Sequence, residues 1–216
     1  MLLPPALRKI NLTAHVSSSV GWFGALLVFL AHGAASLAVQ DDVLQRALCI
    51  AMGVTAWAVI LPLSLASFLT GVVQALGTAW GLLRHYWVVV KLLLTLFATT
   101  ILLLKLAPII ELAQAARTAT VTQASVFDLK LSMTVHAVGG LLVLSLAIVL
   151  AIYKPAGATP FARRRHATVP GEATHSSAAA VPGWVRAAGW VTLALTLGLL
   201  LLLHGGHGPG MHSLHG

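Results

Sequence analysis

The sequence predicts an all-α protein, a polytopic membrane bundle of five transmembrane helices in which four form a core and one is added. Its apolar runs cover residues 12–38, 47–74, 85–107, 131–153 and 185–203, each near or above the ~20 residues with which a helix crosses ~30 Å of hydrocarbon. Charged residues make up only 8% of the chain, against about 25% in soluble domains. The runs are continuous rather than alternating, which favours helices over a β-barrel. We therefore expect the chain to lie in a lipid bilayer.

The first run follows Arg8 and Lys9 and continues to Val39. It is too long for the core of a signal peptide and no clear cleavage site follows it, so it predicts a retained first helix. Trp22 lies near the middle of this helix and Trp57 near the middle of the second. Each of these rings is expected either to face lipid or to wall a buried cavity.

The second run has no charged residue from Ala47 to Leu83, which is more chain than one crossing needs, and Pro62 is expected to kink it. Small and polar residues recur at helical spacing in its second half, a pattern typical of a face that packs closely against another helix in lipid. They are Ser67, Thr70, Gly71, Gln74 and Thr78.

The third run begins at Arg84–Trp87 and contains Lys91, and residues 108–130 are expected to form a short loop or a surface helix outside the membrane. The fourth run contains His136 and ends at Lys154–Pro155. Residues 8–155 are therefore the predicted four-helix core. A flexible basic cytoplasmic linker at 156–183, a fifth transmembrane helix at 184–204 and a His/Gly-rich external tail at 205–216 are expected to follow.

The basic residues predict the orientation of the bundle. Connections on one side carry Arg8, Lys9, Arg84, Lys154, Arg163, Arg164, Arg165 and Arg186, and those on the other carry Arg46, Lys105, Arg117 and Lys130. The side richer in Lys and Arg is cytoplasmic, which predicts a cytoplasmic N-terminus and a periplasmic or extracellular C-terminus in an inner (cytoplasmic) membrane. The net charge of +8 reflects this topology, and no nucleic-acid partner is expected.

Four histidines fall in or beside the core spans and sort by depth into an inner pair, His15 and His85, and an outer pair, His32 and His136. Histidines at matched depth on facing helices are the usual axial ligands of b-type haem. Gly139 and Gly140 lie one turn from His136, where missing side chains would leave room for a macrocycle. Each of these histidines is also open to a purely structural interpretation, as a hydrogen-bond partner of a neighbouring helix.

Helical geometry argues against two stacked haems. His15 and His32 are seventeen residues apart, which places them roughly 100° from a common face. His15 shares its face with Ser18, Ser19 and Trp22, a polar and aromatic stripe expected to point inward. A single haem that involves His15 or His136 is therefore the simpler prediction.

Lys91 lies about six residues inside the third span and has no acidic partner at similar depth. Its ammonium group either snorkels to the interface or is a buried cation that faces a haem propionate, a substrate carboxylate or a proton path. The tail offers a second group of ligands, His204, His207, Met211, His212 and His215. These residues suit copper, nickel or zinc, but their irregular, glycine-rich spacing specifies no geometry.

Three stretches carry a resemblance to known families. They are His15–Gly24, Trp57–Gly71 and Trp80–Leu92, and together they resemble an uncharacterised family of bacterial predicted integral membrane proteins over about residues 8–155. More distantly, the first-helix His before Gly-Trp-x-Gly and the Trp…Lys-Leu pattern are similar to CopD-type copper-resistance and HemJ-type membrane proteins. That similarity implies haem or copper chemistry, with His15 and Lys91 at the matching positions. HemJ-type proteins are protoporphyrinogen oxidases, and the arginine- and histidine-rich signature expected of that enzyme is missing here.

The leading functional prediction is a membrane protein that binds b-type haem for electron transfer or a redox reaction, and whether it is an enzyme is left open. His15 and His136 are the expected ligands, with His85 completing an inner site and His32 an outer one. One alternative is a copper or other metal transport or resistance subunit that uses the tail. Another is a non-catalytic subunit that packs against a membrane or redox partner protein.

Overall fold

The structure is a computed structural model and describes residues 3–78, 81–118 and 123–155, with residues 157, 159, 183, 184, 186, 187 and 190. This part of the chain is all-helical, as predicted. Four helical spans in it are long and apolar enough to cross a membrane. The predicted fifth helix at 184–204 and the tail at 205–216 lie almost entirely outside the described residues.

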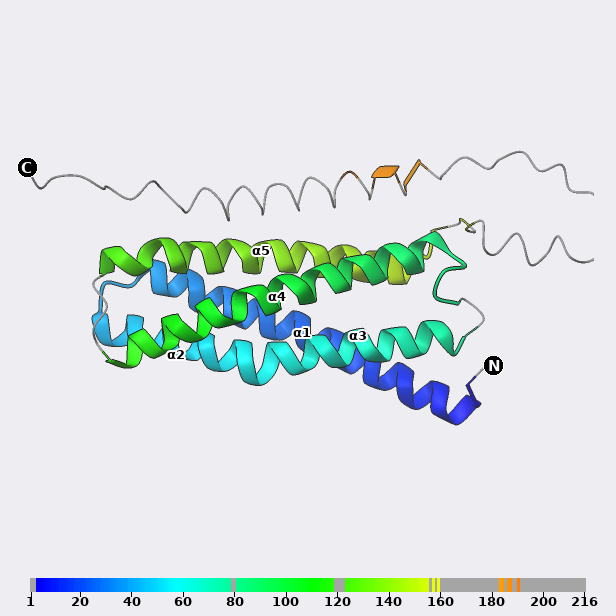
Figure 1. The fold of residues 1–216 in the computed structure, drawn as a ribbon, viewed down its shortest axis with the longest axis horizontal. Coiled ribbons are helices and arrows are strands. Elements are labelled where there is room, and N and C mark those ends of the chain that lie inside the picture. The colour runs from blue at the N-terminus through cyan, green and yellow to red at the C-terminus, as the bar shows by residue number, and fades with distance from the viewer. Residues whose placement is uncertain are drawn as a thin grey trace, which may run out of the picture.

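The first span is α1 (Pro5–Ala38). The second is one continuous helical rod made of α2 (Asp42–Thr55), the π-helical turn η1 (Ala56–Ile60) and α3 (Leu61–Leu76). The third and fourth spans are α4 (Tyr86–Thr118) and α5 (Gln123–Tyr153). The four spans run alternately up and down and lie side by side along the long axis of the molecule (Figure 1).

The four spans form a ring in chain order. The first packs on the second, the second on α4, α4 on α5, and α5 on α1, whereas the backbones of α1 and α4 make no close approach to each other. This is the up-and-down arrangement of a four-helix bundle. Buried Trp22, Phe29, Met52, Leu94 and Met133 form part of its central core.

A π-helical turn precedes Pro62, where the sequence predicts a kink. Proline has no backbone N–H and cannot continue the regular helical ladder. The N–H of Leu61 donates instead to the carbonyl of Ala56, five residues earlier. The extra residue in this turn changes which faces α2 and α3 present to their neighbours.

The segment that follows residue 107, expected as a short loop or surface helix, instead continues α4 to Thr118 through Pro108. Ile109, Leu112, Ala113 and Ala116 are buried there, at the spacing of one helix face. An interior proline costs about 3 kcal/mol or more, which the burial of this apolar face offsets.

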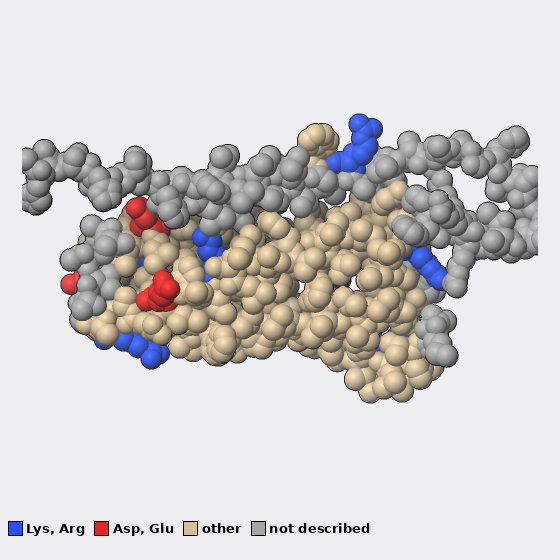
Figure 2. Space-filling model, in the orientation of Figure 1, with Lys and Arg blue, Asp and Glu red and all other residues tan. Residues whose placement is uncertain are grey.

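The two ends of the bundle differ in charge. One end carries Asp41 and Asp42 at the α1–α2 connection and Asp128 in the second turn of α5, and the acidic side chains visible in Figure 2 lie near it. We call it the acidic end. The other, called the basic end, holds the start of α1 with Arg8 and Lys9.

At the basic end, part of the predicted linker is held by the core. The N–H of Tyr86 donates to the carbonyl of Gly157 at 3.2 Å, and the N–H of Thr159 donates to the carbonyl of Arg84 at 2.9 Å. Thr159 is buried, and its hydroxyl also donates to the carbonyl of Leu83. These two residues therefore pack with the core, and residues 160–182 lie outside the described part of the chain.

Candidate functional site

His15 lies in the interface between α1 and α3. Its Nδ1 is 3.0 Å from the carbonyl oxygen of Ser67 and 3.2 Å from Oγ1 of Thr70. A carbonyl only accepts, so Nδ1 carries the proton and donates to it. The ring lies against Gly71, where an added Cβ would come within 2.9 Å of His15 Cε1.

Lys91 reaches His15 from α4, on the opposite corner of the ring. Its Nζ is 3.1 Å from His15 Nε2, and because Nδ1 holds the ring proton, Nε2 accepts from the ammonium group. The two positions that the distant resemblance singles out therefore meet in the interior of the bundle. Lys91 is half-buried and points inward in this arrangement.

The contacts of His15 belong to a longer polar seam between α1 and α3. Asn11 Nδ2 donates to the carbonyl of Thr70 at 3.0 Å and to Oε1 of Gln74 at 2.9 Å. One turn further along, the hydroxyls of Ser19 and Ser67 are 2.7 Å apart. The small-polar face predicted for the second span is confirmed from Ser67 to Gln74, where it packs against α1.

Both ring nitrogens of His15 have partners in this arrangement. Ligation of iron by Nε2 would require Lys91 to withdraw, and rotation of the ring would break the bond to Ser67. The predicted inward stripe is confirmed, because His15, Ser18 and Trp22 are all buried. His15 bonds to α3 and α4, whereas the hydroxyl of Ser18 donates to the carbonyl of His15 in its own helix.

His136 has a different environment. It lines a cavity of about 320 Å³ at the centre of the bundle, which we call the His136 cavity. Trp22, Leu26 and Phe29 of α1 and Ile60 of η1 form part of its wall. Val138 and Leu142 of α5 also line it and are 43% and 56% exposed. The cavity therefore opens along α5 onto the outer surface of the bundle.

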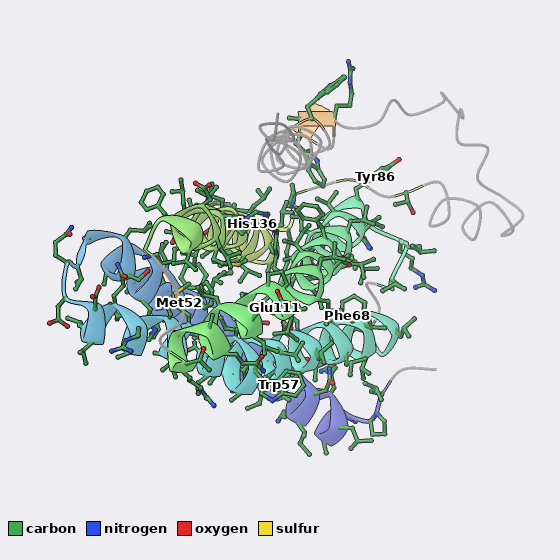
Figure 3. All side chains as sticks on the ribbon, turned by 60° about the vertical axis from the view of Figure 1, so that its left-hand side comes forward. Met52, Trp57, Phe68, Tyr86, Glu111 and His136 are labelled. Atoms are coloured by element: carbon green, nitrogen blue, oxygen red, sulfur yellow. The ribbon has the colours of Figure 1, made fainter. Side chains whose placement is uncertain are left out.

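The imidazole of His136 is held by its own helix. Nδ1 lies 2.6 Å from the carbonyl of Ser132, so Nδ1 carries the proton and Nε2 has a free lone pair. Nε2 is buried and has no hydrogen-bond partner among the described residues, and the side chain is 9% exposed. Figure 3 labels His136 on α5.

A lysine and two glycines complete this cavity. Lys105 of α4 lines it and is half-buried, and Gly139 and Gly140 line it from α5. A Cβ built on Gly139 would meet nothing within 4 Å, whereas one on Gly140 would lie 2.9 Å from Leu26 Cδ2. The room expected beside His136 is present at Gly139.

Neither His32 nor His85 lines the His136 cavity. His32 is half-buried and its Nδ1 has no partner within the described part of the chain. It lies beside Gly33, which packs against Thr134 of α5, so His32 and His136 are at similar heights but do not line the same space. His85 immediately precedes α4, and its carbonyl accepts from the N–H groups of Val88 and Val89.

The two tryptophans expected near mid-membrane have different environments. Trp22 is 2% exposed and lines the His136 cavity, whereas Trp57 is 59% exposed on the outside of the bundle (Figure 3). Among the described residues, no group of three or more His, Cys, Asp or Glu side chains could hold a metal ion. The predicted tail ligands from His204 to His215 lie outside those residues.

Lys105 and Lys130 were predicted in external connections, but both lie inside helices and face the interior of the bundle. Lys105 lies fourteen residues after Lys91, which returns to within roughly 40° of the same helix face. Lys130 is 2% exposed and donates to the carbonyl of Ser36 at 3.4 Å. Lys130 shares a helix face with buried Met133 and Ala137. This helical spacing is the feature of the sequence that could have predicted its burial.

Comparisons of the chain with protein-family models, with curated proteins and with solved structures give no match.

Proposed function

We propose that this membrane protein binds a b-type haem in the His136 cavity, with His136 as the axial ligand. One observation carries the proposal: an imidazole whose ring lines an apolar cavity has a buried nitrogen with a free lone pair and no partner among the described residues. Leaving such a group unpaired costs about 1–3 kcal/mol. An iron bound at Nε2 would remove that cost.

The second ring nitrogen supports the same assignment. Histidines that bind metals usually donate their other N–H to a carbonyl or carboxylate, which fixes the tautomer and the orientation of the ring. The bond from His136 Nδ1 to the carbonyl of Ser132 does this. This bond favours the tautomer in which Nε2 has the free lone pair that an iron would need.

The set of donors favours a macrocycle over a bare metal ion. A protein-bound zinc or copper ion needs three or four side-chain ligands, and the described residues contain no such group. A porphyrin supplies four nitrogen donors itself, so that one histidine can hold it, as the proximal histidine does in globins. The single imidazole in this cavity fits that requirement.

The size and lining of the cavity bear on the fit. Its volume of about 320 Å³ is at the low end of the ~300–1,000 Å³ of ligand pockets. Because it opens past Val138 and Leu142, a planar ligand larger than the closed space would extend to the bundle surface. Lys105 is the cation that would face a propionate.

Bound haem would supply an iron that accepts and donates single electrons. The protein's own residues would orient it through His136 and exclude water with the apolar wall of Trp22, Leu26 and Phe29. Among the described residues no second histidine lines this cavity, so we propose one protein ligand rather than two. The electron partner would then be another membrane or redox protein.

The test is the visible spectrum of the protein purified in mild detergent from haem-replete cells, oxidised and after dithionite. We expect a Soret band and reduced α and β bands in the wild type, and their loss in His136→Ala. His32→Ala is the matched control, because that ring also has an unpaired nitrogen but does not line the cavity. A colourless wild-type protein, or a pigment that survives His136→Ala, would contradict the proposal.

We further propose that the chain lies in a bacterial inner membrane with the basic end in the cytoplasm, and that it is a distant relative of the families it resembles. The basic residues near that end support this orientation through the positive-inside rule. Cysteines introduced at Lys9 and Asp41, both exposed, test it in intact cells after Cys49 is replaced by Ala. A membrane-impermeant maleimide is expected to label position 41 and to spare position 9.

A further inference from the structure

A second cavity lies between the basic end and the His136 cavity, and Trp22 lines both. We call it the Lys91 cavity, and its volume is about 270 Å³. One side of it is polar and the other is apolar. The polar side consists of His15, Ser19, Ser67, Lys91 and Thr95, and α5 contributes residues from Leu144 to Ile152.

The cavity opens sideways between α1 and α5. Val16 and Val20 of α1 line it and are 50% and 63% exposed. Ile148 and Ile152 of α5 line it from the other side and are 37% and 69% exposed. In a membrane these exposed apolar side chains contact lipid, so the mouth faces the bilayer rather than water.

Lys91 brings a charge into this cavity that the described residues do not neutralise. Its ammonium group has three donors, and His15 Nε2, which carries no charge here, accepts one of them. The acidic residues that the structure describes are Asp41, Asp42 and Asp128 at the acidic end and Glu111 in the last third of α4. A lysine charge in a low-dielectric setting is costly unless an anion pairs with it.

From this geometry we infer that the Lys91 cavity binds an amphiphile with an oxyanion headgroup, which enters from the bilayer between α1 and α5. The headgroup would accept hydrogen bonds from Lys91 and from the hydroxyl of Ser19, which has a free hydrogen when Ser67 donates to it, and the acyl chain would lie along the apolar mouth. A cavity of about 270 Å³ accommodates a headgroup and the start of a chain, not a whole lipid. The inference does not depend on haem.

Two sources share this chemistry, a free fatty acid and an anionic phospholipid. The experiment therefore uses two photoactivatable probes with a diazirine in the acyl chain, one a fatty acid and the other a phosphatidic acid. The methyl ester of the fatty acid is the uncharged control. The purified full-length protein is irradiated with each probe, and labelled peptides are identified by mass spectrometry.

We expect labelling within residues 16–20 and 148–152 by one or both acidic probes and not by the methyl ester. Labelling by the fatty acid alone would identify a carboxylate ligand, and labelling by the phosphatidic acid alone would identify a phospholipid. Either result supports the inference. Equal labelling by the methyl ester would overturn it, because the mouth would then be an ordinary lipid-contact surface.

Variants test the role of the charge. Lys91→Ala is expected to weaken the probe's apparent affinity about tenfold or more, since a hydrogen bond to a charged group is lost. Lys91→Arg and Lys9→Ala are expected to retain it, the first because the cation remains and the second because that lysine is exposed outside the cavity. Unchanged binding by Lys91→Ala would overturn the inference. Ala151→Leu fills the cavity while it leaves Lys91 intact, and must also abolish labelling if Lys91→Ala does not fold.

Discussion

The two cavities of this bundle differ in how their histidines are satisfied. In the Lys91 cavity, His15 has protein partners at both ring nitrogens. In the His136 cavity, the ring is held at Nδ1 and its Nε2 has no partner among the described residues. The sequence predicted both histidines as haem ligands, at different depths. The comparison teaches that the buried lone pair, not the histidine itself, marks the better ligand site.

The largest expected effect comes from filling the His136 cavity. A side chain at Gly139 would enter open space, so Gly139→Phe is expected to leave the fold intact and to lower haem occupancy by about a hundredfold, or roughly 2.7 kcal/mol. The ratio of Soret absorbance to protein measures it. Ala151→Leu fills the Lys91 cavity and is expected to keep the pigment. Equal loss of Soret absorbance in both variants would show that haem does not bind specifically in the His136 cavity.

The next effect concerns packing at two glycines. Gly71→Ala places a Cβ 2.9 Å from His15 Cε1, whereas Gly139→Ala places one where no atom lies within 4 Å. We expect Gly71→Ala to lower the free energy of unfolding in mixed micelles by about 1–3 kcal/mol, the usual cost of overpacking. Gly139→Ala is expected to change it far less. The order of the two values is the decisive result.

A smaller effect is expected along the polar seam between α1 and α3. Asn11→Ala removes hydrogen bonds to the carbonyl of Thr70 and to Gln74, and interhelical bonds in membranes contribute about 0.6 kcal/mol on average. A loss of about 1 kcal/mol is expected in the same unfolding measurement. Thr13→Ala is the control, because its hydroxyl is exposed and bonds only to Lys9 of its own helix. Similar losses in both would show that the seam adds no stability.

The smallest effect is expected at Lys105. If it faces a propionate, Lys105→Gln should weaken haem binding a few-fold, in line with about 0.5–1 kcal/mol for a partly exposed ion pair. Lys105→Arg should restore the affinity. Titration of the haem-free protein with haemin gives both values. An unchanged affinity in Lys105→Gln would show that Lys105 does not contribute to haem binding.

Much of the fold follows from sequence, because length, hydropathy and helical spacing act locally. The four core spans, the inward stripe of His15 and the small-polar face from Ser67 to Gln74 were all predicted in this way. The continuation of α4 through Pro108 was not, because the burial of Ile109 and Leu112 depends on packing against other helices. From the local sequence alone, a proline such as Pro108 in a weakly polar stretch predicts the end of a helix.

The site was less predictable for a related reason. Depth grouped His15 with His85 and His32 with His136, but the direction of each ring depends on how the helices are rotated in the bundle. Lys91 meets His15 across the diagonal of the ring, a contact that no spacing rule along one helix reveals. The free nitrogen of His136 likewise depends on whether Nδ1 bonds to a carbonyl of its own helix, as it does at Ser132, or to a neighbouring helix.

The π-helical turn at Ala56–Ile60 also constrains how this sequence can evolve. Such a turn holds one residue more than a regular helix would need, so if it became ordinary α-helix at the same length, every residue beyond it would rotate by roughly 100°. Ser67, Thr70 and Gly71 would then turn away from His15. Loss of one residue here would therefore preserve the α1–α3 contact, whereas substitutions that make the turn a regular helix at the same length would break it.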